Sequence, residues 1–322
     1  MNDNKMKYIA CSIDENYLDH LFVMLTSLFS NNKKYNFYVF IIHNFNDEIH
    51  FQKIHEFFIS SKNSFELINV DDSIIKEDAI VSGHISLSAY YRIYLPEILP
   101  KHINKVLYVD VDIVVKKDLG MLWEKSIDNN SHFAVEDIGF SDQYKHNILM
   151  DNRSIYFNSG ILFINLNYWR ENKIFEKCIL FLKNYKNRIQ LHDQDVLNSV
   201  LCNQWKELPY AYNAQESIFR KDLPLYRNKK YLNAYFNPVI IHYTGGGHSK
   251  PWHKECRHEL KNEYAFYYYK SKMFNNPIWI RVFQIDFKLT FFTLPLVFLG
   301  RFNHQFKRLR LVFLKNNFCY EK

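Results

Sequence analysis

The sequence predicts an α/β domain built on a single mixed, mostly parallel sheet with flanking helices, and three observations support this. Strand-like and helix-like segments alternate along the first seventy residues. The strand-like segments are nearly continuous apolar runs, typical of strands buried on both faces. The chain has 322 residues, of which 48% are hydrophobic, which is enough for a full core. Strands separated in this way by helices favour crossover connections between parallel neighbours.

The predicted elements follow the alternation in chain order. Strands are expected at 7–13, 36–43, 64–70, 105–115, 132–136, 155–166 and 237–243. Helices are expected at 17–30, 47–62, 171–186 and 193–202. From about Glu255 the composition changes to basic and aromatic segments. We therefore predict a main domain at 1–254 and a C-terminal helical appendage at 255–322.

The predicted appendage carries much of the excess positive charge, because 301–315 is rich in Lys and Arg and has no acid. Its most apolar window, 289–300, contains a proline and is shorter than the roughly 20 residues of a spanning helix. We predict that the appendage lies on an anionic membrane surface. A helical cap packed on the core is the alternative. Nucleic acid is not expected as a partner, since no recognition module accompanies the charge.

Cysteine usage and the N-terminal residues bear on the compartment. The five cysteines are scattered, without the close pairs of a zinc site or a disulfide framework, which favours a reducing compartment. The first residues lack the long apolar core of a signal peptide. We expect a cytoplasmic protein, peripheral on the inner face of a bacterial cytoplasmic membrane. The eight glycines form neither GxGxxG nor GxxxxGK[ST], which disfavours a Rossmann dehydrogenase or a P-loop NTPase.

Two carboxylates, Asp110 and Asp112, interrupt the apolar run 105–115. Residues two apart on a strand share a face, so both acids are expected to point the same way. Unpaired, they would repel each other and lose hydration. A divalent cation with hard oxygen ligands, such as Mg²⁺ or Mn²⁺, removes both penalties. A pair solvated at the edge of the sheet is the alternative.

A third ligand type occurs in the segment 240–253. His242 ends an apolar strand, and histidine binds Mn²⁺ well beside carboxylates. Three of the eight glycines follow at 245–247, which indicates close approach of the backbone to a ligand. Lys250 then offers a point charge suited to a departing phosphate. Together these residues predict a metal-diphosphate site; an ordinary glycine-rich turn with a solvated lysine is the alternative.

Six motifs in order now identify a resemblance. They are SIDENY (12–17), HISLSAYYRIYLPEIL (84–99), YVDVDIVV (108–115), FNSGILFINLNYWR (157–170), HDQDVLN (192–198) and HYTGGGHSKPWH (242–253). From about Tyr8 to His253 the chain resembles glycosyltransferase family 8, the bacterial lipopolysaccharide galactosyl- and glucosyltransferases related to glycogenins. The resemblance implies a GT-A fold and a UDP-galactose or UDP-glucose donor. It also implies Mn²⁺, or else Mg²⁺, on Asp110, Asp112 and His242.

The resemblance further implies roles for residues of every motif. Donor-binding residues are expected to be Ser12, Asp14, Asn16, Tyr17, Arg92, Val111, Asn158, Asp193, Gln194, Gly245 and Lys250, together with the metal ligands. His84 and Asp137 are expected to face the acceptor. Alternatives drawn from the residues themselves are a strand-to-helix turn with an acidic cap at 12–17 and an N-terminal cap at Asp193. The loop after His242 is longer than in many relatives, so the glycine that meets the phosphate stays open.

The expected reaction is retaining transfer of a hexose to a hydroxyl of a lipopolysaccharide, lipooligosaccharide or other cell-surface glycan, and a lipid-linked acceptor is expected. Gln194, Asp193 and Lys250 are the expected catalytic residues. Because an amide is a poor nucleophile, front-face attack is preferred to a covalent intermediate. The alternatives are a protein acceptor such as a glycosylated adhesin, a hydrolase of UDP-sugars, and a nucleotide-sugar-binding protein without activity.

Overall fold

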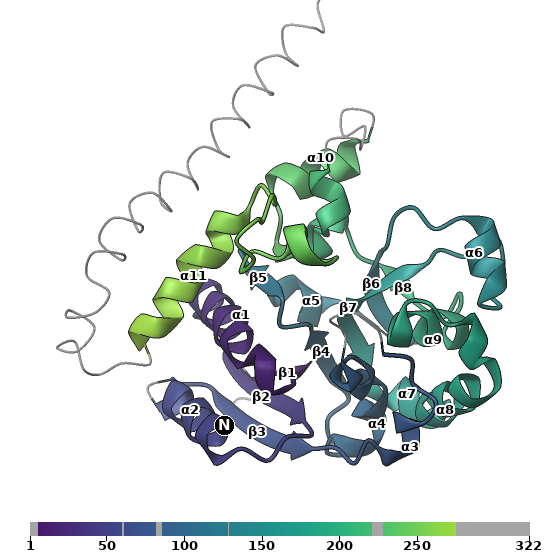
Figure 1. Cartoon of the computed structure of the whole chain (residues 1–322), viewed down its shortest axis with the longest axis horizontal. Helices are drawn as coiled ribbons and strands as arrows, with labels where there is room; N and C mark the ends of the chain where they lie inside the picture. Colours follow the sequence, from purple (N-terminus) through teal and green to yellow (C-terminus); the bar gives the residue numbers. More distant parts are fainter. Residues whose placement is uncertain (1–5, 60, 82–85, 128, 221–227, 275–322) are drawn as a thin grey trace, which may run out of the picture.

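The computed structural model describes residues 6–59, 61–81, 86–127, 129–220 and 228–274 (Figure 1). Within these residues a seven-stranded sheet has the order β3-β2-β1-β4-β7-β6-β8. Its strands are β1 (Met6–Ser12), β2 (Asn36–His43), β3 (Ser64–Asn69), β4 (Lys105–Val109), β6 (His132–Glu136), β7 (Phe157–Asn165) and β8 (Lys206–Glu207). Strands β3, β2, β1 and β4 are parallel, and β7 runs antiparallel to both β4 and β6. The predicted mixed α/β fold is confirmed.

Helices cover both faces of this sheet (Figure 1). They are α1 (Leu18–Asn31), α2 (Glu48–Ile59), α3 (Ser73–Lys76), α4 (Leu95–Ile98), α5 (Gly120–Glu124), α6 (Asp142–Asn147), α7 (Leu166–Glu171), α8 (Ile174–Tyr185), α9 (His192–Val200), α10 (Lys229–Phe236) and α11 (Lys261–Phe274). Adjacent residues of β1 point to opposite faces of the sheet. Ile9 packs in one apolar cluster with Leu21 and Leu25 of α1, whereas Ala10 packs in the other with Val196 of α9. This alternation explains why the strand is apolar throughout.

The predicted strand 105–115 is divided in the structure. Strand β4 ends at Val109, and β5 (Ile113–Val115) pairs antiparallel with β9 (Ile240–His242) in a separate two-stranded sheet. The expectation that Asp110 and Asp112 share one face of one strand is therefore wrong. The chain turns at these residues, and the turn brings their carboxylates to a cavity instead of a buried strand face, where desolvation would be costly.

The beginning of the predicted appendage packs on the main domain. Leu260, Tyr264 and Tyr267 are buried in the same apolar cluster as α1. In Figure 1 helix α11 lies beside α1, and the Asn31 side-chain amide donates to the Tyr267 hydroxyl at 2.7 Å. Residues 275–322, which contain most of the predicted membrane-binding segment, lie outside the described residues. Among the residues that are described, no helix is long and apolar enough to span a bilayer.

Candidate active site

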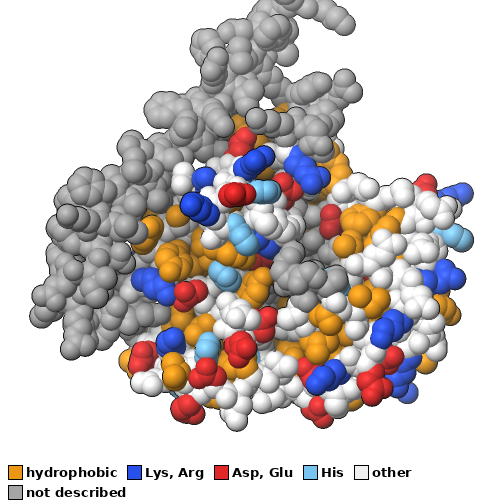
Figure 2. All heavy atoms as spheres, viewed as in Figure 1, with side chains coloured by type: hydrophobic (Ala, Val, Ile, Leu, Met, Phe, Trp, Pro, Cys, Tyr) orange, Lys and Arg blue, Asp and Glu red, His pale blue; other side chains and the backbone are white. Residues whose placement is uncertain are grey.

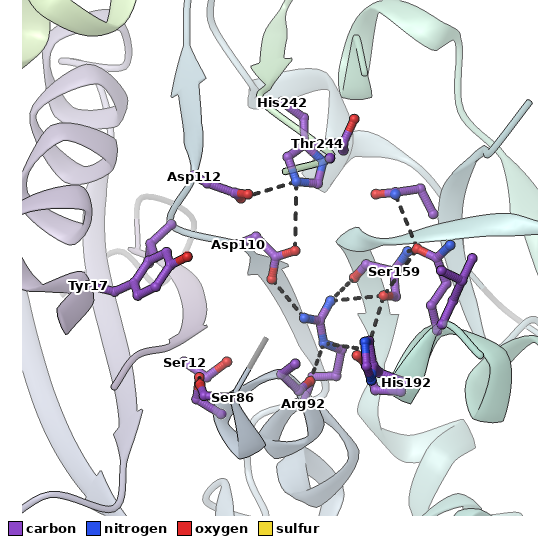
Figure 3. Close-up of a pocket in the computed structure, with 18 of the residues that line it drawn as sticks. Ser12, Tyr17, Ser86, Arg92, Asp110, Asp112, Ser159, His192, His242 and Thr244 are labelled. Atoms are coloured by element: carbon purple, nitrogen blue, oxygen red, sulfur yellow. Dashed lines mark hydrogen bonds and ion pairs between the residues drawn. The ribbon is translucent and has the colours of Figure 1, made fainter. Parts of the chain in front are cut away.

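A polar cavity of about 410 Å³ opens at the carboxyl ends of β1 and β4, where β7 begins. On the face drawn in Figure 2, charged and histidine side chains gather near the centre of the molecule with apolar side chains among them. The predicted residues that line the cavity are Ser12, Asp14, Tyr17, Arg92, Val111, Asp110, Asp112, Asp137, Asn158, Asp193, Gln194, His242, Gly245 and Lys250 (Figure 3). Seven sequence segments thus converge on one cavity, at the sheet edge where open α/β folds bind ligands.

One described residue among those predicted, Asn16, does not join this cavity. Asn16 is exposed and does not line it; instead its backbone N–H donates to Asp14 Oδ1 at 2.9 Å. Asp14 therefore caps the short turn Glu15–Tyr17, as the alternative interpretation of this segment expects. Its other oxygen accepts from the Ser86 hydroxyl at 2.6 Å, so Asp14 both caps the turn and lines the cavity. His84 lies outside the described residues.

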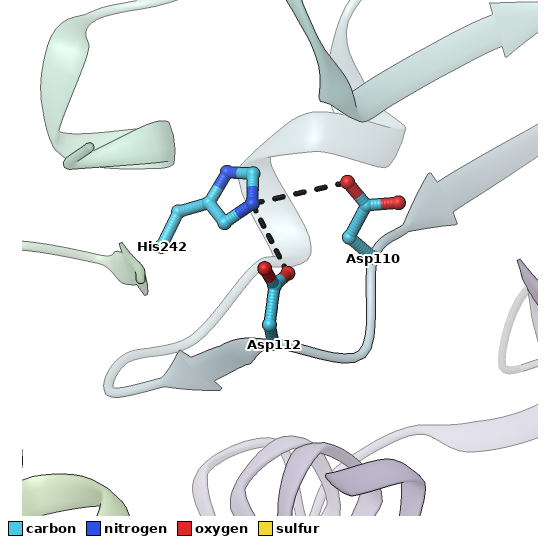
Figure 4. Close-up of side chains that lie close together, drawn as sticks. All are labelled: Asp110, Asp112 and His242. Carbon is cyan, nitrogen blue, oxygen red and sulfur yellow. Dashed lines mark ion pairs between the residues drawn. The ribbon is translucent and has the colours of Figure 1, made fainter. Parts of the chain in front are cut away.

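Asp110, Asp112 and His242 meet at the end of β9 (Figure 4). Pairing of Ile113 with His242 places the histidine beside the turn that carries both acids. His242 Nε2 lies 3.1 Å from Asp112 Oδ1 and 3.8 Å from Asp110 Oδ2. One ligand atom from each of the three side chains lies within 4.8 Å of the others. This spacing suits a single divalent cation bound by two carboxylates and an imidazole.

Two further observations fit a cation at this position. Asp112 Oδ1 is buried and accepts no hydrogen bond, although a buried carboxylate oxygen normally has a partner. Gly160 of β7 borders the space in which these side chains meet. A Cβ on Gly160 would lie 2.3 Å from His242 Cε1 and 2.5 Å from Asp110 Oδ2. Only glycine leaves room for His242 and Asp110 at this point, and a glycine within an apolar strand indicates close approach of another group.

Lys250 lies next to these ligands. Its Nζ donates to Asp112 Oδ2 at 2.5 Å and to the Tyr243 carbonyl at 2.7 Å. Burial alone raises the pKa of Asp112, but the charge of Lys250 outweighs burial and holds that pKa well below its usual range. Asp112 is therefore ionised at neutral pH, the form in which a carboxylate can bind a metal.

Arg92 connects Asp110 to the other end of the cavity (Figure 3). Its guanidinium lies 2.8 Å from Asp110 Oδ1 and 3.0 Å from Asp193 Oδ2, and it stacks over the Tyr108 ring at 4.5 Å. Burial raises the pKa of Asp193 to about 6; Arg92 opposes the rise and Asp110 adds to it. Asp193 also accepts from the Ser159 hydroxyl at 3.0 Å. The N-cap of α9 is Leu191, so Asp193 lies in the first turn of the helix and is not its cap.

Gln194 is held by donors from β7. Its Oε1 accepts from the Ser159 backbone N–H at 3.0 Å and from Asn158 Nδ2 at 3.1 Å, while its Nε2 donates to Asp137 Oδ2 at 3.0 Å. Burial raises the pKa of Asp137, although these amide contacts oppose the rise. The amide of Gln194 is thus fixed in position at the wall of the cavity, with its oxygen already occupied by two donors.

Sequence reasoning missed several lining residues, namely Ser86, Ser88, Ala89, Ser159, Leu191, His192, Thr244 and Gly246. Ser86 precedes the short helix Leu87–Tyr94 and Ser88 lies within it, inside the motif 84–99. Their small polar side chains gave no reason to prefer them. His192 adopts a left-handed backbone, with φ of 54°, which sequence does not reveal. Such backbone positions are frequent at functional sites.

Comparisons with known proteins identify the family. The family model described as "Glycosyl transferase family 8" matches residues 8–256. General stress protein A of Bacillus subtilis (strain 168) is 33% identical over 286 residues, which cover 86% of this chain and 99% of that protein. Lipopolysaccharide 1,2-glucosyltransferase of Escherichia coli (strain K12) is 28% identical over 286 residues, which cover 86% of this chain and 80% of that protein.

A solved structure shows the same fold. The galactosyltransferase LgtC, in complex with donor and acceptor sugar analogs, superposes with a TM-score of 0.73 and is 26% identical. The match covers 82% of this chain and 95% of that one. The predicted family resemblance and GT-A fold are confirmed. The chain is a glycosyltransferase and belongs to glycosyltransferase family 8.

Proposed function

We propose that the protein transfers galactose or glucose from a UDP-sugar to a hydroxyl of a glycan acceptor, with Mn²⁺, or else Mg²⁺, held by Asp110, Asp112 and His242. One observation carries this proposal: three metal-ligating side chains converge around Gly160 beside a buried lysine, at the wall of a polar cavity. The similarity to a lipopolysaccharide glucosyltransferase and to LgtC supports it. When bound, the cation would act as a Lewis acid that neutralises charge on the diphosphate.

The cavity suggests where each part of the donor binds. Ser12, Asp14 and Tyr17, at the end of β1, would hold the nucleoside. Gly245 and Lys250 would face the diphosphate, since a lysine can balance the charge that develops on a leaving phosphate. The sugar would then lie against a set of polar side chains with fixed hydrogen bonds, Arg92, Asn158, Asp193 and Gln194. Asn16 is left out because it is exposed away from the cavity.

The same residues favour transfer with retention by front-face attack. An acceptor hydroxyl would form the new bond to the anomeric carbon as the bond to the phosphate breaks, and its proton would pass to the departing phosphate. Gln194 offers an amide whose oxygen accepts two hydrogen bonds, which makes it a poor nucleophile. A covalent intermediate would need a nucleophilic carboxylate close to the anomeric carbon. Asp193 is a carboxylate in this set, but it is already engaged by Arg92 and the Ser159 hydroxyl.

Steady-state assays of UDP release test the proposal. We expect Mn²⁺-dependent release from UDP-glucose or UDP-galactose in preference to their N-acetyl forms, and a higher rate once deacylated lipooligosaccharide is added. The new linkage, read by NMR, should keep the anomeric configuration of the donor. Release from none of these donors would contradict the proposal. Release at one rate with and without every glycan acceptor would indicate a hydrolase.

A lipid-linked acceptor and a peripheral position on the inner membrane face remain proposals that rest on the composition of 255–322. Full-length protein should sediment with vesicles that contain anionic lipid and should leave them as salt is raised, because salt screens surface charge. Binding to neutral vesicles alone, or no binding at low salt, would contradict this part of the proposal. It would leave the proposed sugar transfer untouched.

A further inference from the structure

Hydrogen bonds behind His242 have a direction that can be assigned from one backbone donor. The backbone N–H of Gly160 can only donate, and it donates to Asn158 Oδ1 at 3.1 Å. This contact fixes the orientation of the Asn158 amide, because the flipped amide would set two donors against each other. With its oxygen so fixed, the Nδ2 of Asn158 faces Gln194 Oε1 and Asp137 Oδ2, which can accept.

The same reasoning fixes the orientation of Asn213, a residue outside the six motifs. This side chain is buried, with 0% of its surface exposed, and its Nδ2 donates to Asn158 Oδ1 at 2.8 Å. Its Oδ1 must then face His242 Nδ1, which lies 2.9 Å away. An amide oxygen only accepts, so the proton of the neutral imidazole is on Nδ1. The lone pair of His242 Nε2 is left pointing toward Asp110 and Asp112.

We propose that Asn213 is a positioning residue that holds His242 in the Nδ1–H form and presents Nε2 to the metal. The inference rests on the proposed function, because it assigns Nε2 as the ligand atom. In the Nδ1–H form, His242 Nε2 and Asp112 Oδ1, which lie 3.1 Å apart, both carry lone pairs, so a cation bound between them would make the approach favourable. Partners of metal-binding histidines commonly fix the ring in this way, and their loss weakens metal binding about 10- to 100-fold.

Two variants separate this role from a purely structural one. Asn213→Leu has a similar size but removes both the acceptor for His242 and the donor to Asn158. Asn213→Asp also removes the donor to Asn158 but keeps an acceptor for His242 Nδ1–H. Gly160 still donates to Asn158 Oδ1 in both variants. A difference between the two variants therefore reports the contact to His242, and a shared loss reports the contact to Asn158.

The first readout needs no metal. Nitrogen-15 NMR of histidine-labelled, metal-free protein distinguishes a protonated ring nitrogen from an unprotonated one, and His242→Gln identifies the signals of His242. We expect Nδ1 of His242 to be protonated in the wild type and in Asn213→Asp, and to lose this preference in Asn213→Leu. Protonation of Nε2 alone in the wild type would overturn the proposal, even if Asn213→Leu fails to fold.

The second readout is Mn²⁺ affinity, measured from the electron paramagnetic resonance signal of unbound Mn²⁺ with UDP present. We expect Asn213→Leu to bind Mn²⁺ about 10- to 100-fold more weakly and Asn213→Asp to stay close to the wild type. Equal weakening in both variants would overturn the proposal. Failure of the proposed function would look different, because the wild type itself would then bind no Mn²⁺ while the His242 spectrum stayed unchanged.

Discussion

Gly160 lies so close to His242 that a Cβ on the glycine would be 2.3 Å from Cε1 of the imidazole. Non-bonded carbon atoms do not approach each other so closely, so the position of His242 requires a glycine here. Asp110 Oδ2 would lie 2.5 Å from the added atom. The space in which Asp110 and His242 meet is thus set by the absence of one side chain in β7.

Gly160→Ala should therefore abolish Mn²⁺ binding. Overpacking of this kind should also lower the free energy of unfolding by about 1–3 kcal/mol. Ile161→Val is the matched control, because it changes the next buried residue of β7 at a comparable cost of about 0.5–1.5 kcal/mol. The control should bind Mn²⁺ normally by paramagnetic resonance. Wild-type Mn²⁺ affinity in Gly160→Ala would show that the proposed metal site is wrongly assigned.

Lys250→Met should distinguish a role of Lys250 in stabilising the leaving group from a role in metal binding. We expect UDP release to slow by about 10²- to 10³-fold, the usual effect of removing a donor that stabilises developing charge. Mn²⁺ should bind at least as tightly as in the wild type, since a cation next to Asp112 is gone. Lys254→Met is the control, because Lys254 is exposed farther along the chain and should change neither quantity. Weaker Mn²⁺ binding in Lys250→Met would mean that the lysine organises the ligands instead.

Asp193 gives the fold a pH dependence of predictable sign. Its pKa is about 6 in the folded chain, mainly because of burial, against about 3.9 for an ordinary aspartate. The folded state holds the proton more tightly, so the contribution to stability is present below about pH 4 and is lost as pH rises through about 6. Over that window the wild type should lose up to about 3 kcal/mol relative to Asp193→Asn. Urea unfolding of both proteins measures this, and a constant difference would refute it.

Tyr264 tests whether α11 belongs to the catalytic domain. The side chain is 3% exposed, and its hydroxyl contacts His20 Nδ1 at 2.5 Å, while its ring lies 5.4 Å from that of Trp252. Tyr264→Ala should cost about 3–5 kcal/mol, by analogy with other buried aromatic side chains. Tyr264→Phe keeps the packing and should cost only about 0.5–1.5 kcal/mol. Unfolding of Tyr264→Ala at the wild-type denaturant concentration would indicate an independent appendage.

Local sequence patterns predict much of the sheet. The expected strands 36–43 and 132–136 coincide with β2 and β6, because continuous apolar runs bounded by polar turns have few other buried arrangements. The run 105–115 was different. Its apolar character continues through Asp110 and Asp112, yet β4 and β5 join different sheets. That division depends on pairing with β9, more than a hundred residues away, and no local pattern reports it.

The candidate site shows the same contrast. Asp110, Asp112, His242 and Lys250 could be predicted from their chemistry, because charged and imidazole groups in apolar surroundings need a reason to be there. Asn213 acts only through contacts with Asn158 and His242, which are 55 and 29 residues away. A buried asparagine in an unremarkable segment carries no local indication of such contacts. Gly160 lies within the motif 157–170, but its role depends on where His242 lies.

The central claim is that Asp110, Asp112 and His242 hold a metal that sugar transfer requires, and UDP release by Asp112→Ala tests it most directly. Wild type and variant should be compared with UDP-glucose and UDP-galactose, with Mn²⁺ and after chelation. We expect the wild type to release UDP only with Mn²⁺, and Asp112→Ala to lose at least about 10²-fold in rate while remaining folded. Equal UDP release by the two proteins, or wild-type release that survives chelation, would contradict the account.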